Sequence, residues 1–235
     1  MKKVLFIDYD GTLHDSDAKY AAKLNGILGL NGMQIWKAYL HVHRGIVHQR
    51  YPEKHDDFFF HQRLLFAYLK KPYDDKIART LAGRFRQAQQ ETWKNPTFFP
   101  DALPFLNKVK DKYILCLTTG DYAPEKAKAL EKAGGESYFS YAFDKDHLGL
   151  KSHSSSYYNN AVMSTKSRPE DVLVIGDSPE HDIAAAKGAG LATVWVNRRG
   201  IPLMENSPRP DFQAKDMLDI AGLYREFVGA TRESP

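Results

Sequence analysis

The fold is decided by a stretch near the start of the chain, which reads Val4-Leu5-Phe6-Ile7-Asp8-Tyr9-Asp10-Gly11-Thr12. Its apolar half includes β-branched residues and predicts a short strand buried inside a parallel sheet. Asp8 and Asp10 follow directly, at the strand end where open α/β sheets place their active sites. Gly11 then allows a sharp turn of the backbone. Two carboxylates this close together need a cation or a shared proton between them.

Two simpler structures must be considered for the acidic pair. A polar loop with a turn-forming glycine has the same composition. A calcium loop of the EF-hand type also begins with Asp-x-Asp-Gly, but it requires a glutamate at its twelfth position, and that position is Lys19. The calcium loop is therefore excluded, and residues elsewhere must decide between a plain loop and an active site.

The composition is that of an ordinary globular protein. The 235 residues predict one or two domains, with 43% hydrophobic and 26% charged residues. A net charge of +4 is too small to indicate nucleic-acid binding. The single cysteine, Cys116, excludes a disulfide framework or a cysteine-rich metal site. Residues 1–7 are too short for a signal peptide, and no apolar stretch approaches the roughly 18 residues of a membrane span. We expect a cytoplasmic protein that binds neither membrane nor nucleic acid.

The pattern along the chain predicts a core interrupted by a helical insertion. Residues 16–96 carry apolar residues at helical spacing, for example Phe60, Leu64 and Leu65. From residue 97 onward, strands and helices alternate. The expected strands are 113–117, 141–143, 172–175 and 192–196, and the expected helices are 124–133, 154–164, 183–189 and 217–228, with an extended connector over 200–211 and frayed residues 229–235. This alternation predicts an α/β doubly wound parallel sheet that includes residues 4–7.

Other predicted strand ends also carry reactive side chains. The strand 113–117 runs into Thr118 and Thr119, and the strand 172–175 runs into Gly176 and Asp177, with Asp182 a little further on. Lys151 lies between these two strands in the sequence. Carboxylates are the oxygen ligands that Mg²⁺ prefers, and a hydroxyl with a lysine can neutralise phosphoryl oxygens. The set therefore favours phosphoryl transfer over a plain loop.

Four motifs in order make the chain resemble the haloacid dehalogenase (HAD) superfamily. They are Asp8-Tyr9-Asp10-Gly11-Thr12-Leu13, then Thr118, then Lys151, then Gly176-Asp177 through Asp182. The resemblance is to the phosphatase branch with an α-helical C1-type cap, and it implies a Rossmann-like catalytic core over residues 1–15 and 97–235 with a helical cap domain over 16–96.

The resemblance implies a role for each motif residue. Asp8 would be the nucleophile that forms an aspartyl-phosphate, and Asp10 the general acid and then base. Phosphate binding would fall to Gly11, Thr118, Thr119 and Lys151, with Thr118 and Lys151 contributing to catalysis. Asp8, Asp177 and the backbone carbonyl of Asp10 would bind Mg²⁺, and Asp182 would support that site without binding the ion itself.

The resemblance also separates branches of the superfamily. The dehalogenases lack the second aspartate of the first motif and need no metal, whereas Asp10 is present here. Two positions depart from the family pattern: Thr119 stands where an asparagine is frequent, and Ser152 follows Lys151 where a proline is usual. The second departure leaves Lys145 as a rival for the role of the motif-three lysine.

The predicted function is Mg²⁺-dependent hydrolysis of a small phosphomonoester by a monomer or homodimer. The cap carries 14 Lys and Arg against 7 Asp and Glu, which favours an anionic metabolite as substrate. Three alternatives stay open. A phosphomutase and a phosphonate hydrolase belong to the same superfamily, and the latter would need an imine-forming cap lysine such as Lys19, Lys23 or Lys54. A phosphate-binding regulatory protein with little turnover is the alternative of another class.

Overall fold

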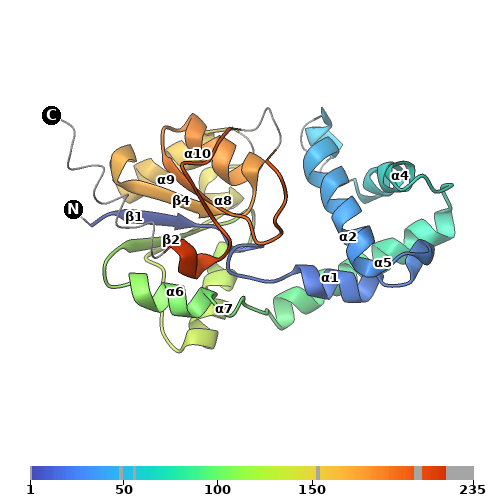
Figure 1. The fold of residues 1–235 in the computed structure, drawn as a ribbon, viewed down its shortest axis with the longest axis horizontal. Helices are drawn as coiled ribbons and strands as arrows, with labels where there is room; N and C mark the ends of the chain where they lie inside the picture. Colours follow the sequence, from blue (N-terminus) through green and yellow to red (C-terminus); the bar gives the residue numbers. More distant parts are fainter. Residues whose placement is uncertain (1, 48–49, 55–56, 152–153, 204–207, 221–235) are drawn as a thin grey trace. The chain divides into compact units, whose positions relative to one another are not determined.

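The chain folds into two compact units. The computed structural model describes residues 2–47, 50–54, 57–151, 154–203 and 208–220 (Figure 1). One unit combines residues 1–15 with 98–235, and we call it the sheet unit. The other is the contiguous segment 16–97, which we call the helical unit.

The sheet unit is built on six parallel strands, which confirms the predicted fold class. The strands are β1 (Val4–Ile7), β2 (Ile114–Thr118), β3 (Tyr141–Phe143), β4 (Val172–Gly176), β5 (Ala192–Val196) and β6 (Phe212–Ala214). Their order across the sheet is β3-β2-β1-β4-β5-β6, so the strand order reverses direction at β1. This order is that of a doubly wound α/β fold, which binds its ligands where the order reverses, beyond the carboxyl ends of the strands.

The first strand lies at the centre of the sheet. Val4 is opposite Ile114 on one side and Val172 on the other, and this register continues to Ile7, which is opposite Leu117 and Ile175. All four residues of β1 are buried. A strand covered on both faces must be apolar throughout, which explains why this segment does not alternate with polar residues.

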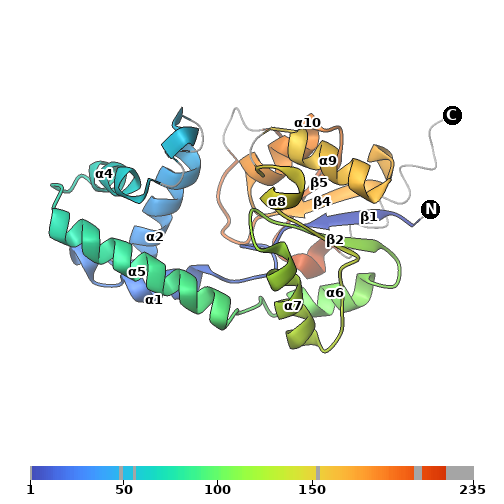
Figure 2. The same ribbon diagram turned by 180° about the vertical axis from the view of Figure 1, so that it is seen from behind.

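Helices cover both faces of this sheet (Figures 1 and 2). On one face, Leu5 and Ile7 pack in a cluster with Phe105 and Leu130 of α6 and α7. On the other face, Phe6 packs in a cluster with residues of α9 and α10 and with the buried Cys116. The helices of this unit are α6 (Ala102–Val109), α7 (Ala123–Gly134), α8 (Lys145–Leu148), α9 (Ser156–Thr165) and α10 (Ala185–Gly188).

Several predicted boundaries differ from the structure. β6 falls just after the predicted connector, where its three residues carry no periodic signal. The helix expected at Ile183 already begins at Pro179, as a wider π-helical turn to Ala184, because the side chain of Ser178 accepts a hydrogen bond from the N–H of His181 and caps it. The helix expected from Met217 begins there, but residues 221–235, including the predicted frayed end, lie outside the described part of the chain.

In the described residues of the helical unit, four α-helices are joined by 3₁₀ and π-helical turns. They are α1 (Asp17–Leu24), α2 (Gly32–Leu40), α4 (Phe58–Tyr68) and α5 (Asp75–Lys94), with the 3₁₀ turns Ile27–Gly29 and Pro52–Lys54 and the π-helical segment His41–Val47. Asn31 and Gln34 form a reciprocal capping box at the start of α2, and Asp74 caps α5. Leu65, Leu81 and Phe85 are among the residues that form its own apolar core.

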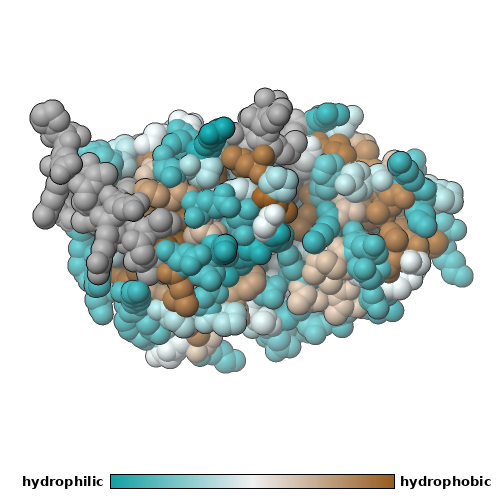
Figure 3. Space-filling view, viewed as in Figure 1, coloured by the Kyte–Doolittle hydropathy of each residue, from teal (hydrophilic) through white to brown (hydrophobic). Residues whose placement is uncertain are grey.

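The face seen in Figure 3 is largely hydrophilic, with groups of hydrophobic residues between the polar ones. A folded domain normally keeps part of its apolar surface exposed. Among the described residues, none of the helices has the length and apolar character that crossing a bilayer requires.

Candidate active site

The central strands bring three of the predicted side chains to one edge of the sheet. Asp8 follows β1, Thr118 is the last residue of β2, and Asp177 follows β4. Because Ile7 is in register with Leu117 and Ile175, these three residues occupy adjacent positions beyond the apolar core. The N–H of Asp8 donates to the carbonyl of Ile175 at 2.9 Å, which continues the ladder into the site.

Lys151 reaches into this site from the loop after α8. Its Nζ donates to Asp8 Oδ1 at 2.6 Å and to the Thr118 carbonyl at 3.0 Å, and it lies 2.6 Å from Asp182 Oδ1. Lys145, the rival in the sequence, is exposed in α8. The geometry therefore places Lys151, rather than Lys145, beside Asp8.

Asp182 is held from several sides. Its Oδ2 accepts from the N–H of Ser178 at 3.0 Å, and its Oδ1 accepts from the hydroxyl of Tyr158 at 3.2 Å. A Cβ on Gly176 would come within 2.2 Å of Asp182 Cγ. Only glycine fits at that position, and the close approach fixes the carboxylate against the end of β4.

Burial and neighbouring charge perturb the ionisation of the central pair. Burial raises the pKa of Asp8, and the nearby carboxylates of Asp182 and Asp177 add to this, so that it reaches about 7 although Lys151 opposes the shift. Burial alone would lower the pKa of Lys151, but Asp182 and Asp8 outweigh it and hold that pKa well above its usual value. A cluster with more carboxylates than ammonium groups would be relieved by a further cation.

The donor set fits a divalent cation. Asp8, Asp177 and Asp182 each offer a carboxylate oxygen, and these three atoms lie within 4.8 Å of one another. Hard oxygen donors of this kind suit Mg²⁺. Gly11, at φ +87°, lies against Asp177, since a Cβ there would come within 2.2 Å of Asp177 Oδ2. Arg199 Nη1, 3.2 Å from the same oxygen, supplies positive charge at this edge.

The hydroxyl of Thr118 has no hydrogen-bond partner among the described residues, although the side chain is fully buried. An unmade buried hydrogen bond is costly and calls for an explanation. A hydroxyl at the strand end next to Asp8 can donate to an oxygen of a bound anion. Thr12, by contrast, uses its hydroxyl to donate to Asp8 Oδ2 at 3.1 Å.

Thr119, another of the predicted phosphate ligands, uses its hydroxyl in a contact with a lysine. Its hydroxyl oxygen accepts a hydrogen bond from Lys126 Nζ at 2.8 Å, and its side chain is 2% exposed. The same Lys126 Nζ donates to Asp10 Oδ2 at 2.9 Å. The structure thus links Thr119 to Asp10 through a lysine.

The Asp10 side chain is bound by Lys126 and His14 and is not part of the cluster of three carboxylates. Besides Lys126 on Oδ2, its Oδ1 lies 2.9 Å from His14 Nδ1. Loss of water around Asp10 would raise its pKa, but Lys126 and His14 outweigh this and hold the pKa of Asp10 below its usual range. Both carboxylate oxygens of Asp10 thus have protein partners. The metal ligand predicted at this position is the backbone carbonyl, not the side chain.

Comparison with known proteins agrees with this geometry. The sequence model described as "haloacid dehalogenase-like hydrolase" matches residues 2–190, which is most of the chain. This chain belongs to the haloacid dehalogenase-like hydrolases. It is therefore a hydrolase, as the four motifs predicted.

Curated relatives of this HAD hydrolase are phosphatases. The N-acylneuraminate-9-phosphatase of Homo sapiens is 25% identical over 95% of this chain and 94% of its own length. The phosphoserine phosphatase of Thermus thermophilus is 25% identical over 61% of this chain and 56% of its own length. These relatives support a phosphatase of the HAD superfamily.

Solved structures of HAD proteins share the fold. The HAD-hydrolase YfnB of Bacillus subtilis, in a form bound to magnesium, has a TM-score of 0.70 and 19% identity, covering 94% of this chain and 98% of its own. The L-2-haloacid dehalogenase of Xanthobacter autotrophicus has a TM-score of 0.67 and 18% identity, covering 96% and 99%. At these identities, the likeness concerns the fold alone.

Two residues at the site of this HAD hydrolase were missed by the sequence analysis. Lys126 is 116 positions from Asp10, on α7, and no role was predicted from the sequence for the lysines of this helix. One signal was available, because Lys126 shares the apolar stripe of α7 with Ala123, Ala127 and Leu130 at helical spacing. His14 is within the first motif's turn, and no pattern distinguished it from a core histidine.

Proposed function

We propose that this protein is a Mg²⁺-dependent phosphatase that hydrolyses a small phosphomonoester through an aspartyl-phosphate on Asp8. One observation carries the proposal: the Asp8 carboxylate is bound by Lys151 at 2.6 Å, at the strand end beside the unpartnered hydroxyl of Thr118. A nucleophile, a fixed positive charge and a free donor at one strand edge are what transfer of a phosphoryl group requires.

The bond changes and proton transfers of the reaction can be assigned to individual side chains. Asp8 would attack phosphorus through one carboxylate oxygen while the bond to the leaving oxygen breaks. Asp10 would give a proton to that leaving oxygen and later take one from the water that attacks the phosphorylated Asp8. The Thr118 hydroxyl and the Lys151 ammonium would bind phosphoryl oxygens and stabilise the charge that develops on them.

The residues that would hold Mg²⁺ are Asp8, Asp177 and the carbonyl of Asp10, with Asp182 fixing Lys151 and the end of β4. The ion would supply positive charge that allows a phosphate dianion to approach the Asp8 carboxylate. The clustering of the carboxylates of Asp8, Asp177 and Asp182, of which only Asp8 and Asp182 contact Lys151, supports this assignment.

For the substrate we propose a class rather than one compound. The names of the relatives refer to an N-acylneuraminate, to phosphoserine and to pyrimidine 5′-nucleotides. These are small phosphorylated metabolites with different leaving groups. The relative that aligns over nearly the whole of both chains is the acylneuraminate phosphatase, which makes phosphorylated acidic sugars the first compounds to screen.

Phosphonate cleavage is less well supported by the helical unit. It would need a lysine whose amine is uncharged and free to form an imine. Lys23 Nζ lies 2.8 Å from Glu91 Oε2, and Lys54 Nζ lies 3.4 Å from Asp57 Oδ2. Each of these two amines thus contacts a carboxylate and is not free to attack a carbonyl group.

The test is hydrolysis of p-nitrophenyl phosphate and of a panel of phosphorylated metabolites, with Mg²⁺ and with EDTA. We expect turnover that requires Mg²⁺ and that Asp8→Asn abolishes, while circular dichroism of the variant stays unchanged. Beryllium fluoride should bind wild-type protein in the presence of Mg²⁺ and fail to bind Asp8→Asn. Wild-type turnover by Asp8→Asn, or no turnover of any phosphomonoester, would refute the proposal.

A further inference from the structure

We infer that Lys126 is a positioning residue that holds the Asp10 carboxyl group where it exchanges a proton with the leaving oxygen. The inference rests on the proposed function, because it takes Asp10 as the general acid. It concerns a residue outside the four motifs. Lys126 is 7% exposed and lies within the apolar face of α7.

All three N–H donors of the Lys126 ammonium are used. Nζ lies 2.9 Å from Asp10 Oδ2, 2.8 Å from Thr119 Oγ1 and 2.8 Å from Asp121 Oδ1. An ammonium group has no more than three donors, so this set of acceptors fixes its direction. Thr119 and Asp121 thereby orient the lysine, and the lysine orients Asp10.

The second oxygen of Asp10 is held independently. His14 Nδ1 lies 2.9 Å from Asp10 Oδ1, and the His14 ring is itself fixed by stacking on Tyr9, with ring centroids 4.9 Å apart. Both carboxylate oxygens are therefore bound from the protein side. The Asp10 side chain nevertheless stays 41% exposed, so it remains accessible to a substrate.

Stability alone does not explain a lysine at this position. Taking an ammonium group out of water is costly, and apolar residues that replace buried ion pairs are often neutral or stabilising. The neighbours of Lys126 on the same stripe of α7 are Ala123, Ala127 and Leu130, so an apolar residue would suit the stripe. The orientation of Asp10 is the function that the contacts of Lys126 point to.

The same contacts explain the departure at Thr119. The family pattern often has an asparagine here, whereas in this chain a hydroxyl oxygen accepts from Lys126. The peptide N–H of Thr119 donates to Phe143 at 3.0 Å, so its backbone is bound to β3. Thr119 is therefore part of the support for Asp10 in this protein.

In the chemical step, Lys126 transfers nothing. As the Asp8 oxygen bonds to phosphorus and the ester P–O bond breaks, the proton of the Asp10 carboxylic acid passes to the leaving oxygen and leaves a carboxylate. That carboxylate is the form that Lys126 and His14 bind best. When water attacks the phosphorylated Asp8, its proton passes back to Asp10 and the bond from Asp8 to phosphorus breaks.

Leaving-group basicity distinguishes this role from a structural one. An alkoxide needs a proton as it departs, whereas p-nitrophenolate hardly does. We would measure kcat and KM of wild type, Lys126→Met and Lys126→Arg on glycerol 2-phosphate, phenyl phosphate and p-nitrophenyl phosphate. Lys128→Met, an exposed lysine two residues further along α7, is the matched control.

We expect Lys126→Met to lower kcat on glycerol 2-phosphate at least about tenfold more than on p-nitrophenyl phosphate, a part of the 10²–10⁴ that general acid catalysis contributes. KM should change little, because Lys126 does not bind phosphate. Lys126→Arg should recover part of the loss on the alkyl ester, and Lys128→Met should behave as wild type. Thr119→Val should shift kcat in the same direction by less.

Equal losses on all three esters, or a loss confined to KM, would overturn the inference. Thermal melting of each variant identifies one that fails to fold, and in that event Thr119→Val and Lys126→Arg decide the question. Failure of the proposed function has a different signature, because wild-type protein would then hydrolyse none of the three esters with Mg²⁺.

Discussion

The charged side chains at the strand ends of the sheet unit differ in burial from most of those in the helical unit. Near the strand ends, the side chains of Lys151 and Lys126 are 5% and 8% exposed, and the ammonium group of each is surrounded by oxygens. In the helical unit, Arg79 pairs with Asp75 at 2.9 Å with both side chains more than 60% exposed. Buried polar atoms occur there too, among them Lys19 Nζ, and His43 Nδ1 and His61 Nε2 form a part-buried hydrogen bond at 3.0 Å.

This difference shows where the chemistry is concentrated. Burying an ammonium or a carboxylate costs several kcal/mol unless partners surround it, whereas an exposed pair costs and contributes little. Two buried lysines that each contact two carboxylates therefore mark the strand ends as the reactive region. The excess of exposed basic residues on the helical unit says little about which substrate is bound.

The largest expected effect is that of removing the buried charge beside Asp8. Lys151→Met should lower kcat on a hydrolysed phosphomonoester by about 10³-fold, as loss of one stabilising donor does. Lys145→Met, six residues earlier and exposed, should have wild-type activity. Steady-state kinetics of both variants test this, and comparable losses would show that the buried position carries no special role.

A smaller effect is expected from the apolar core of the helical unit. Leu65→Ala should destabilise that unit by about 3 kcal/mol, because Leu65 is fully buried. In a Trp195→Phe background, Trp36 and Trp93 alone report urea unfolding, and both lie in the helical unit. Phe59→Ala, 46% exposed on the same helix, is the control. If Leu65→Ala left this transition unmoved, its burial would have no energetic consequence.

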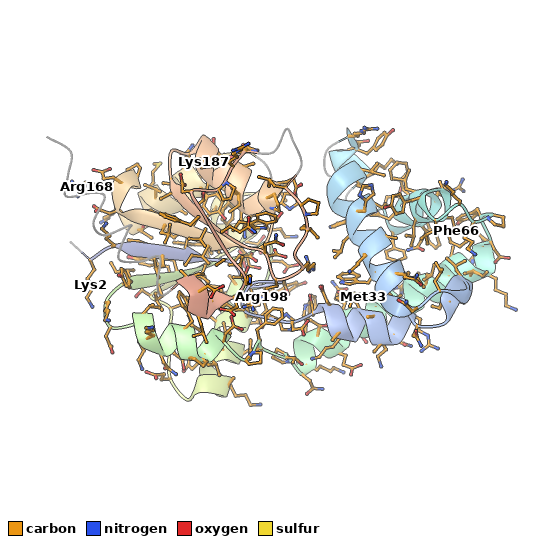
Figure 4. The ribbon with its side chains drawn as sticks, viewed as in Figure 1. Lys2, Met33, Phe66, Arg168, Lys187 and Arg198 are labelled. Carbon is orange, nitrogen blue, oxygen red and sulfur yellow. The ribbon has the colours of Figure 1, made fainter. Side chains whose placement is uncertain are left out.

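The same substitution in the two regions sharpens the comparison further. Figure 4 labels Arg198, which belongs to the sheet unit. It donates to both oxygens of Asp101, at 3.1 and 2.7 Å, and its guanidinium lies 3.9 Å from the centroid of the Phe99 ring. Arg198→Met should destabilise the sheet unit by about 2 kcal/mol, since it leaves Asp101 partly unsatisfied. Arg79→Met should leave the free energy of unfolding unchanged. Urea unfolding measures both, and equal shifts would contradict the contrast.

Predictability also differs between the two regions. The central strands β1, β2 and β4 could be predicted because each is a run of apolar residues, and Asp8, Thr118 and Asp177 stand at their ends. Lys126 could not, since its partners come from residues far apart in the chain. β6 was missed because its three residues, beginning at Phe212, depend on pairing with β5 rather than on a local pattern. In the helical unit, apolar spacing predicted helices but no function.

The smallest expected effect concerns pH and Mg²⁺. The pKa of Asp8 is raised from 3.8 to about 7, so the folded protein holds a proton there that the unfolded chain loses, and this group's contribution to stability falls as pH rises from about 4 to 7. Mg²⁺ needs the carboxylate, so its affinity should be about tenfold higher at pH 8 than at pH 6, which corresponds to about 1.4 kcal/mol.

Thermal melting with and without Mg²⁺ at the two pH values checks this. The increase in melting temperature should be larger at pH 8, and Asp177→Asn should abolish it at both. An increase of the same size at pH 6 and pH 8 would show that protonation of Asp8 does not compete with the ion.

The central position of β1 has a consequence for synthesis of the chain. Its neighbours are β2, which begins at Ile114, and β4, which begins at Val172. At about 5–20 residues per second, the ribosome therefore makes β4 roughly 10–30 seconds after β1. The helical unit is one contiguous segment and is complete before either partner strand exists. Until β2 has been made, the nascent chain carries an apolar strand with no partner, and one edge of Val4–Ile7 stays unpaired until β4 follows. Exposed apolar segments of this kind are prone to aggregation and are what chaperones protect.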